Sequence, residues 1–383
     1  LNDPDIDNVQ IKESGQGLDF EIIQGSKKLV GLLRQNSIRV QSKVAKIKQM
    51  EEKLLRHLLE YNFELRYSRF GITDDDHISI IFDSSTDDGS PYKLYYALKE
   101  VANHSDKQDD LLIYQYTTVE HIDKSLFNHI QPNQKTIKYK YLISSIHNCR
   151  AYIENHTDLV KNYSGGIAYL LLSLAYKLDF LIKPEGYLMD RLEEINAIYF
   201  NNNIPDPSCK INHIQNEYEL ILERPESSLK EEMYWVKSTF GITTPVNHDR
   251  ISNFIEGELN NMDWYVENDY HTIAESIPGY IVGYALFHFA PPKPDLEYLQ
   301  FYYRIIETEF YSNLGFKNLY YNPKKRSFNR KEIKKYLKSI VRRNYEMYPY
   351  LNPNLSSLRF GSKSEFARSY LRMIQNLDMT RNE

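Results

Sequence analysis

The chain has 383 residues and a formal net charge of −5, with 42% hydrophobic and 26% charged residues. This composition supports a packed core and excludes wholesale disorder, and the length predicts two or three domains. No stretch approaches 18 apolar residues, so the sequence predicts no transmembrane segment. The cysteines Cys149 and Cys209 form no CxxC pair, which argues against a zinc site and favours a reducing, cytoplasmic location.

The first 130 residues carry the signals of a small mixed module. Residues 1–39 begin with Asp, Asn and Gly and predict a loose N-terminal arm with a strand near Phe20–Ile23. We expect a small α/β module to follow at 40–130. No signal peptide begins at Leu1, and because the chain does not start with Met, an earlier leader remains an open alternative.

The expected module contains two helices and two strands. Apolar residues at helical spacing predict a helix over 42–61. Alternating and apolar runs then predict strands at Phe63–Phe70 and Ile78–Phe82. Ser90-Pro91 marks the start of a second helix that ends near 103, because Ser caps a helix and Pro fits its first turn.

Helical patterns dominate the rest of the chain. The predicted helices lie at 138–156, 166–182, 187–200, 211–223, 229–240, 248–276, 295–313 and 330–345. We expect a helical region over 138–316 with a break near 201–207 or 241–247, then a basic helix and C-terminal segment over 317–383. The predicted fold class is α+β, mainly α, with a small N-terminal α/β module before a large irregular helical region.

A basic stretch near the C-terminus is the strongest functional signal. Between Pro323 and Arg343, ten basic residues stand against one acid, Glu332, a local charge of +9 that leaves −14 for the rest of the chain. The basic residues are Lys324, Lys325, Arg326, Lys331, Lys334, Lys335, Lys338, Arg330, Arg342 and Arg343. Concentrated charge of one sign selects partners of the opposite sign.

The same stretch predicts a docked helix. Asn329 and Glu332 form a helix-start signature. Ile333, Leu337 and Ile340 fall on one face, so the helix packs on the protein and turns its lysines to solvent. The basic face predicts an acidic protein partner; nucleic acid, a membrane surface or an idle solvated face are the alternatives.

No catalytic constellation is predicted. Asp263, Glu267, His271 and Glu275 recur every four residues, but four such positions fan over about 120° and cannot converge on one metal. The acidic loop Asp74–Asp76 is better explained by turn formation. The sequence therefore predicts no catalytic residue, metal ligand or cofactor.

Packing and hydrogen bonding are also the favoured interpretations for three other groups of residues that could take part in chemistry. His147 and Cys149 lack an orienting group for nucleophilic chemistry, and Gly165-Gly166 is not part of a phosphate-loop motif. His288 lies among apolar residues and predicts a hydrogen-bonded core histidine.

The order of elements in residues 42–103, with the helix start Gly89-Ser-Pro-Tyr-Lys-Leu-Tyr-Tyr-Ala-Leu98, resembles the small α/β unit of YbjN and type III secretion chaperone-like proteins. The resemblance extends over residues 42–127. It implies a non-catalytic module that binds another polypeptide.

The leading hypothesis is a non-enzymatic, chaperone-like or scaffold protein that binds partners through Tyr-rich helical surfaces and the basic helix. A nucleic-acid-binding protein using residues 323–343 is the first alternative. An enzyme whose site is assembled from distant residues, such as Glu267, His271 and the Asp74–Asp76 loop, is the second. The oligomeric state stays open.

Overall fold

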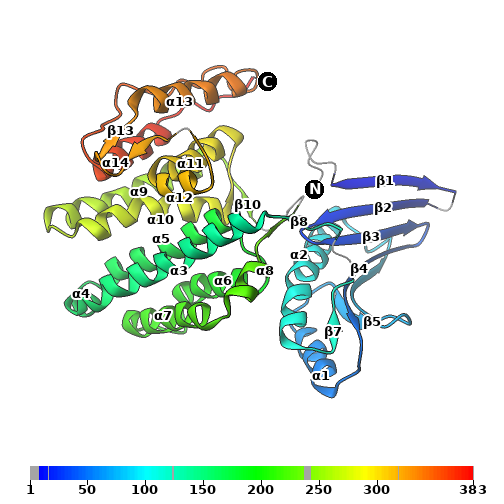
Figure 1. Cartoon of the computed structure of the whole chain (residues 1–383). Helices are drawn as coiled ribbons and strands as arrows, with labels where there is room; N and C mark the ends of the chain where they lie inside the picture. Colours follow the sequence, from blue (N-terminus) through cyan, green and yellow to red (C-terminus); the bar gives the residue numbers. More distant parts are fainter. Residues whose placement is uncertain (1–7, 16, 123–124, 237–242, 318, 383) are drawn as a thin grey trace. The chain divides into compact units, whose positions relative to one another are not determined.

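The computed structural model describes residues 8–15, 17–122, 125–236, 243–317 and 319–382. They divide into two units: unit 1 comprises Leu1–Ile130, Pro184–Asp190 and Glu231–Ile242, and unit 2 comprises Gln131–Lys183, Arg191–Lys230 and Thr243–Glu383. An antiparallel sheet followed by many helices, with 57% of the described residues in helices and 16% in strands, confirms the predicted class, α+β and mainly α (Figure 1).

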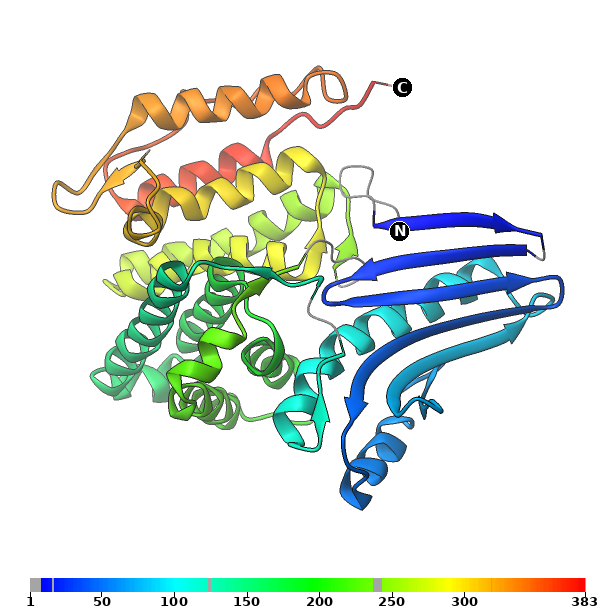
Figure 2. The same cartoon turned by 45° about the vertical axis from the view of Figure 1, so that its right-hand side comes forward.

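Unit 1 is built on an antiparallel sheet. Its strand order is β1-β2-β3-β4-β6-β5, and β7 pairs with the end of β4 beyond a bulge between Lys43 and Ala45 (Figure 2). The strands are β1 Val9–Ser14, β2 Gly17–Gln24, β3 Lys27–Arg34, β4 Ser37–Ile47, β5 Arg69–Ile72, β6 His77–Ser85 and β7 Val119–Glu120. The short strands β8 Asn128–His129 and β9 Tyr234–Trp235 form a separate pair.

The expected loose arm over residues 1–39 is wrong for its described part, because β1, β2 and β3 pair with one another, whereas the strand expected near Phe20–Ile23 is confirmed within β2. In β3 the burial of the residues alternates: Leu29 and Gly31 are buried, whereas Lys28, Val30 and Leu32 are exposed. Apolar and polar residues alternate only weakly along this segment of the sequence. The segment still forms strands, because hydrogen bonds along the whole sheet add to the stabilisation from side-chain burial.

Two helices belong mainly to unit 1: α1 Glu52–Tyr61 and α2 Pro91–Gln115. The predicted helix over 42–61 is wrong in its first part, where β4 continues to Ile47 and the side chains of Ser42 and Val44 are buried at strand spacing. As predicted, Ser90 caps α2 by accepting the N–H of Lys93 at 3.2 Å. The helix continues past the expected end near 103 and packs against β4 and β6.

The predicted strand Phe63–Phe70 is wrong over most of its length. Residues 62–68 form turns, and the side chain of Phe63 is 92% exposed. The carboxylate of Glu100 on α2 accepts the backbone N–H groups of Arg66, Tyr67 and Ser68 at 2.8–2.9 Å. The hydrogen bonds of these backbone N–H groups are therefore accepted by a side chain and not by the carbonyl groups of a neighbouring strand. The second predicted strand, Ile78–Phe82, is confirmed as part of β6.

Unit 2 is helical. Its helices are α3 Pro132–Glu154, α4 Thr157–Asn162, α5 Ser164–Ile182, α7 Pro207–Glu223, α8 Glu226–Glu231, α9 His248–Glu267, α10 His271–His288, α11 Lys293–Ile306, α12 Thr308–Asn313, α13 Arg330–Asn344 and α14 Lys363–Gln375. Helix α6 Gly186–Phe200 begins in unit 1 and continues into unit 2. The short strands are β10 Thr244–Pro245, β11 Phe289–Ala290, β12 Tyr321–Asn322 and β13 Ser327–Phe328.

The predicted boundaries differ from this division. Residues 317–383 do not separate from the helical region, because α14 packs against α9, α10 and α11 in unit 2. The predicted helix 248–276 is two helices, since Asp269 has a left-handed φ of 63° that ends α9. The predicted helix 229–240 is also wrong where it is described, with α8 ending at Glu231 before β9; residues 237–240 lie outside the described residues.

Helices α5 and α10 form the closely packed centre of unit 2. A Cβ atom at Gly283 would lie 2.5 Å from Tyr176 Cβ and 2.7 Å from Tyr303 Oη, so only glycine fits there. By length and composition α5 could cross a membrane, but 67% of its apolar window is buried within the structure, as in a core helix. This is weak support for a membrane span, and no clear transmembrane segment is present among the described residues.

Candidate functional site

The predicted basic helix is confirmed as α13, and it is docked as expected. Ile333, Leu337 and Ile340 are fully buried, and Asn329 caps the helix by accepting the N–H of Glu332 at 3.3 Å. The ring of Tyr336 stacks on Phe301 of α11 with centroids 4.0 Å apart. The helix is therefore a fixed part of unit 2.

Four cations on α13 form a line on the opposite side of the helix. We call Lys331, Lys335, Lys338 and Arg342 the basic stripe; all four are exposed. At about 100° per residue they lie within an arc of about 60°, which faces away from the buried residues. Lys335 lies 3.8 Å from Glu332, and in the described part of the chain no acid lies within ion-pair distance of the other three.

The remaining cations of the basic stretch have different surroundings. Arg330 and Arg343 flank the stripe: Arg330 lies over the ring of Phe360, and Arg343 Nε donates to Glu297 Oε2 at 3.1 Å. These two arginines therefore help to dock the helix. Lys334 is half-buried beside the stripe. The turn of the β12–β13 hairpin exposes three more cations, Lys324, Lys325 and Arg326.

The four residues at intervals of four, Asp263, Glu267, His271 and Glu275, for which the sequence favoured a polar surface over a metal site, lie on α9 and α10. Asp263 is paired with Arg368, and Glu267 is exposed at the end of α9. His271 begins α10 at 66% exposure, with its Nε2 3.6 Å from the exposed carboxylate of Asp269. Because α9 ends before Asp269 and α10 begins at His271, these positions do not share one helix, and the arrangement offers a solvated polar surface.

The acidic loop of the enzyme hypothesis belongs to unit 1 and is also exposed. Within Asp74–Asp76, the carboxylate of Asp75 is bound by Lys43, Thr73 and His77. These hydrogen bonds, that of Lys43 foremost, hold the pKa of Asp75 below its usual range. An anion held by local partners stabilises the turn and is not poised for proton transfer.

Three other candidates are explained by packing. Burial raises the pKa of the Cys149 thiol to about 12, so it is protonated and unreactive at neutral pH. Gly166 allows close contact with Ile273 and Tyr265. His288 Nε2 lies 3.0 Å from Asn196 Oδ1, in agreement with a hydrogen-bonded histidine in the core.

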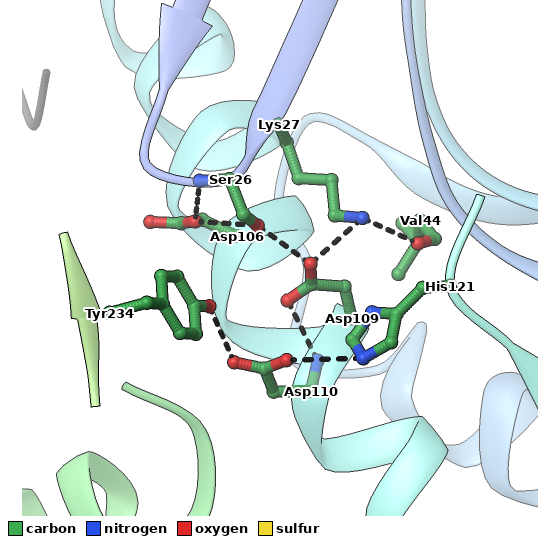
Figure 3. Close-up of polar contacts among 8 residues, drawn as sticks. All are labelled: Ser26, Lys27, Val44, Asp106, Asp109, Asp110, His121 and Tyr234. Atoms are coloured by element: carbon green, nitrogen blue, oxygen red, sulfur yellow. Dashed lines mark hydrogen bonds and ion pairs between the residues drawn. The ribbon is translucent and has the colours of Figure 1, made fainter. Parts of the chain in front are cut away.

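A buried polar network in unit 1 was missed by sequence analysis (Figure 3). Lys27 Nζ lies 2.8 Å from Asp109 Oδ2 and donates to the carbonyl of Val44 at 2.9 Å. Ser26 Oγ donates to the same carboxylate at 2.6 Å. Lys27 is 4% exposed and Asp109 is fully buried, so each charge depends on the other.

Two further carboxylates of α2 flank this pair. Asp106 accepts the N–H of Ser26 at 2.7 Å, and Asp110 accepts the hydroxyl of Tyr234 at 2.8 Å. Burial and the charge of Asp109 raise the pKa of Asp106 to about 7 and that of Asp110 well above its usual range. The network thus connects α2 with the β2–β3 turn and with β9.

Three side chains at this network lie close enough together to ligate a metal ion. Ligand atoms of Asp109, Asp110 and His121 all lie within 4.8 Å of one another. However, the ammonium of Lys27 already lies against Asp109 and neutralises it, so this carboxylate needs no cation. We interpret the group as a structural network and assign no metal to it.

A polar cleft of about 980 Å³ lies in unit 2 among α3, α5, α10, α12 and α14. Tyr141 Oη donates to Glu307 Oε2 at 2.8 Å, and Lys177 Nζ lies 3.2 Å from Glu307 Oε1. Burial of Glu307 opposes its ionisation, but the charge of Lys177 and the hydrogen bonds from Tyr141 and Lys177 together outweigh burial and lower the pKa of Glu307. The carboxylate is thus already neutralised, which gives the cleft no free charge at this position.

No protein-family model matches the chain, and no curated protein matches it either. The order α1, β5, β6, α2 agrees with the predicted order of elements. The resemblance of residues 42–127 to YbjN and type III secretion chaperone-like modules is untested and stays a prediction.

Proposed function

We propose that this protein is a non-enzymatic, chaperone-like or scaffold protein that binds an acidic partner polypeptide through the basic stripe of α13. The observation that carries the proposal is the stripe itself, four exposed cations in line on a helix that is anchored by its buried face. Charge complementarity of this kind steers association and selects partners.

Like-charge contacts of the basic stripe, and of Lys334 beside it, are unfavourable for the isolated protein. Lys331 and Lys335, Lys334 and Lys338, and Lys338 and Arg342 are spaced i, i+4 along α13. Like charges at this spacing destabilise a helix by about 0.2–0.5 kcal/mol per pair. A bound acidic segment would relieve this repulsion.

Exposed apolar groups beside the stripe favour a polypeptide as the partner. Tyr345 and Tyr350 follow α13 and are 62% and 60% exposed, and Met347 is 55% exposed. Tyrosine and methionine are enriched at protein interfaces, where they provide apolar contact area. The stripe is about 16 Å long, which matches a short peptide segment.

The test is fluorescence anisotropy with a labelled twelve-residue peptide rich in Glu and Asp, measured at 50 and 200 mM salt. We expect binding that weakens with salt and is lost in the variant Lys331→Glu/Lys338→Glu/Arg342→Glu. The matched control is Lys12→Glu/Lys46→Glu/Lys53→Glu, which reverses three exposed lysines of unit 1 and should bind as the wild type does. If the stripe variant binds the acidic peptide as tightly as the control variant does, the proposal is refuted.

Nucleic acid is the second candidate, because clustered cations also neutralise phosphates. The same titrations with labelled random-sequence single-stranded RNA and DNA separate the two. Tighter binding to RNA or DNA than to the peptide, lost in the stripe variant, would replace the polypeptide with a nucleic acid. We place the protein in the cytoplasm, a proposal supported by its two free cysteines.

A further inference from the structure

The open face of the unit 1 sheet, opposite α2, carries a second candidate binding site. A pocket of about 560 Å³ lies over β3 and β4, and the segment that follows β7 contributes Ile122 and Leu126 to its wall. This volume lies within the range of small-molecule sites. Every described residue of the lining belongs to unit 1.

The floor of the pocket is apolar where a solvated sheet face is usually polar. On β3, Leu29 points into the core and is fully buried, whereas Val30 and Leu32 point the other way and are 43% and 37% exposed. In the pairing of β3 with β4, Val30 lies opposite Gln41, and Leu32 lies opposite Arg39. An apolar strip therefore runs beside a polar and cationic one.

All charged side chains among the described lining residues are cations: Lys27, Lys28, Arg39 and Lys43. Lys27 is neutralised by Asp109, while Lys28 and Lys43 form exposed pairs with Glu21 and Asp75, which contribute little energy. Arg39 differs from them, since no acid of the described chain lies within ion-pair distance of it. Its cross-strand neighbour Asp83 is paired with Arg69.

The position of the pocket disfavours an added peptide strand. Both β3 and β4 are paired with neighbours on either side, so their backbone groups are already satisfied. Strand addition needs a free sheet edge, and side-chain contacts alone must hold the ligand here. The surface thus fits a small molecule with one anionic end and one apolar end.

We propose that this pocket binds a free carboxylate with a medium-length acyl chain. The carboxylate lies at the guanidinium of Arg39, which can donate two parallel hydrogen bonds to it, and the chain covers Val30, Leu32, Ile122 and Leu126. The site is separate from the basic stripe of α13, so its test does not depend on the proposed function.

The experiment is isothermal titration of the full chain with octanoate below its micelle concentration. We expect one site, with binding at least tenfold weaker in Arg39→Gln because a charge-assisted contact is lost, and also weaker in Leu32→Thr. Octanamide, which has no charge, and butyrate, which has a short chain, should bind at least tenfold more weakly than octanoate.

Two exposed residues of α1 provide matched controls. Arg56→Gln and Leu59→Thr make the same chemical changes outside the pocket and should leave octanoate binding unchanged, as should the stripe variant of α13. Circular dichroism shows whether each variant is folded. Absence of octanoate binding, equal binding of octanamide, or wild-type binding by folded Arg39→Gln and Leu32→Thr would overturn the proposal.

Discussion

Removing the carboxylate of Asp109 should destabilise unit 1 strongly. In Asp109→Leu, the ammonium of Lys27, now 4% exposed, would lose its counterion and keep its hydrogen bond to the carbonyl of Val44 at 2.9 Å. Breaking a buried ion pair in this way costs about 3–5 kcal/mol, because one charge is left without its counterion. The loss of the hydrogen bond from Ser26 adds to this cost.

The double variant Lys27→Met/Asp109→Leu separates the lost charge pair from general disruption. Replacing both members of a buried pair with apolar residues is often neutral, so the double variant should regain at least about 2 kcal/mol relative to Asp109→Leu. Its stability would show that the pair contributes through mutual compensation and not through a large net attraction.

Urea unfolding followed by tryptophan fluorescence measures both effects. The chain has two tryptophans, so a Trp264→Phe background leaves Trp235 as the reporter of unit 1. A loss below about 1 kcal/mol in Asp109→Leu, or a double variant no more stable than that single variant, would refute the argument from burial.

Three further predictions also use urea unfolding, with Trp235→Phe as the background for the variants of unit 2, so that Trp264 reports that unit. Gly283→Ala should destabilise unit 2 by about 1–3 kcal/mol, because the added methyl group overpacks the contact between α5 and α10. Gly257→Ala on the open face of α9 should stabilise unit 2 by about 0.5–1 kcal/mol, because alanine favours a helix. Equal effects of the two variants would contradict the close approach of α5 and α10. Burial raises the pKa of Asp106 in the folded protein from 3.8 to about 7, so the unfolded chain loses this proton at a lower pH than the folded protein does. The stability of unit 1 should therefore fall as the pH rises from about 4 to 7. An equally steep fall in Asp106→Asn would exclude this residue as the source. Lys338→Gln removes two like-charge i, i+4 contacts and should stabilise unit 2 by about 0.4–1 kcal/mol in low salt, a gain that should vanish in high salt if repulsion is its cause.

Local patterns in the sequence predicted the elements whose signals lie close together along the chain. Ser90-Pro91 marked the start of α2, and Asn329 marked that of α13. The spacing of Ile333, Leu337 and Ile340 gave the buried face of α13 and therefore its exposed basic face. Capping and periodicity act within a few residues, so they can be recognised without the tertiary structure.

The N-terminal sheet and the polar network depended on contacts between distant residues. Strands β1 to β3 have weak alternation, and only pairing across the sheet makes them favourable. The predicted helix ended near 103, so sequence analysis assigned no role to Asp109; the structure extends α2 past it and brings Lys27 to within 2.8 Å of its carboxylate.

The sequence by itself determined the fold class and the exposed cations of α13, because composition, capping and helical periodicity are properties of neighbouring residues. Only the tertiary structure decided which acids are buried, where α9 ends and which apolar residues remain uncovered on the sheet. These features depend on residues separated by tens of positions, whose contacts balance desolvation against pairing once the chain is folded.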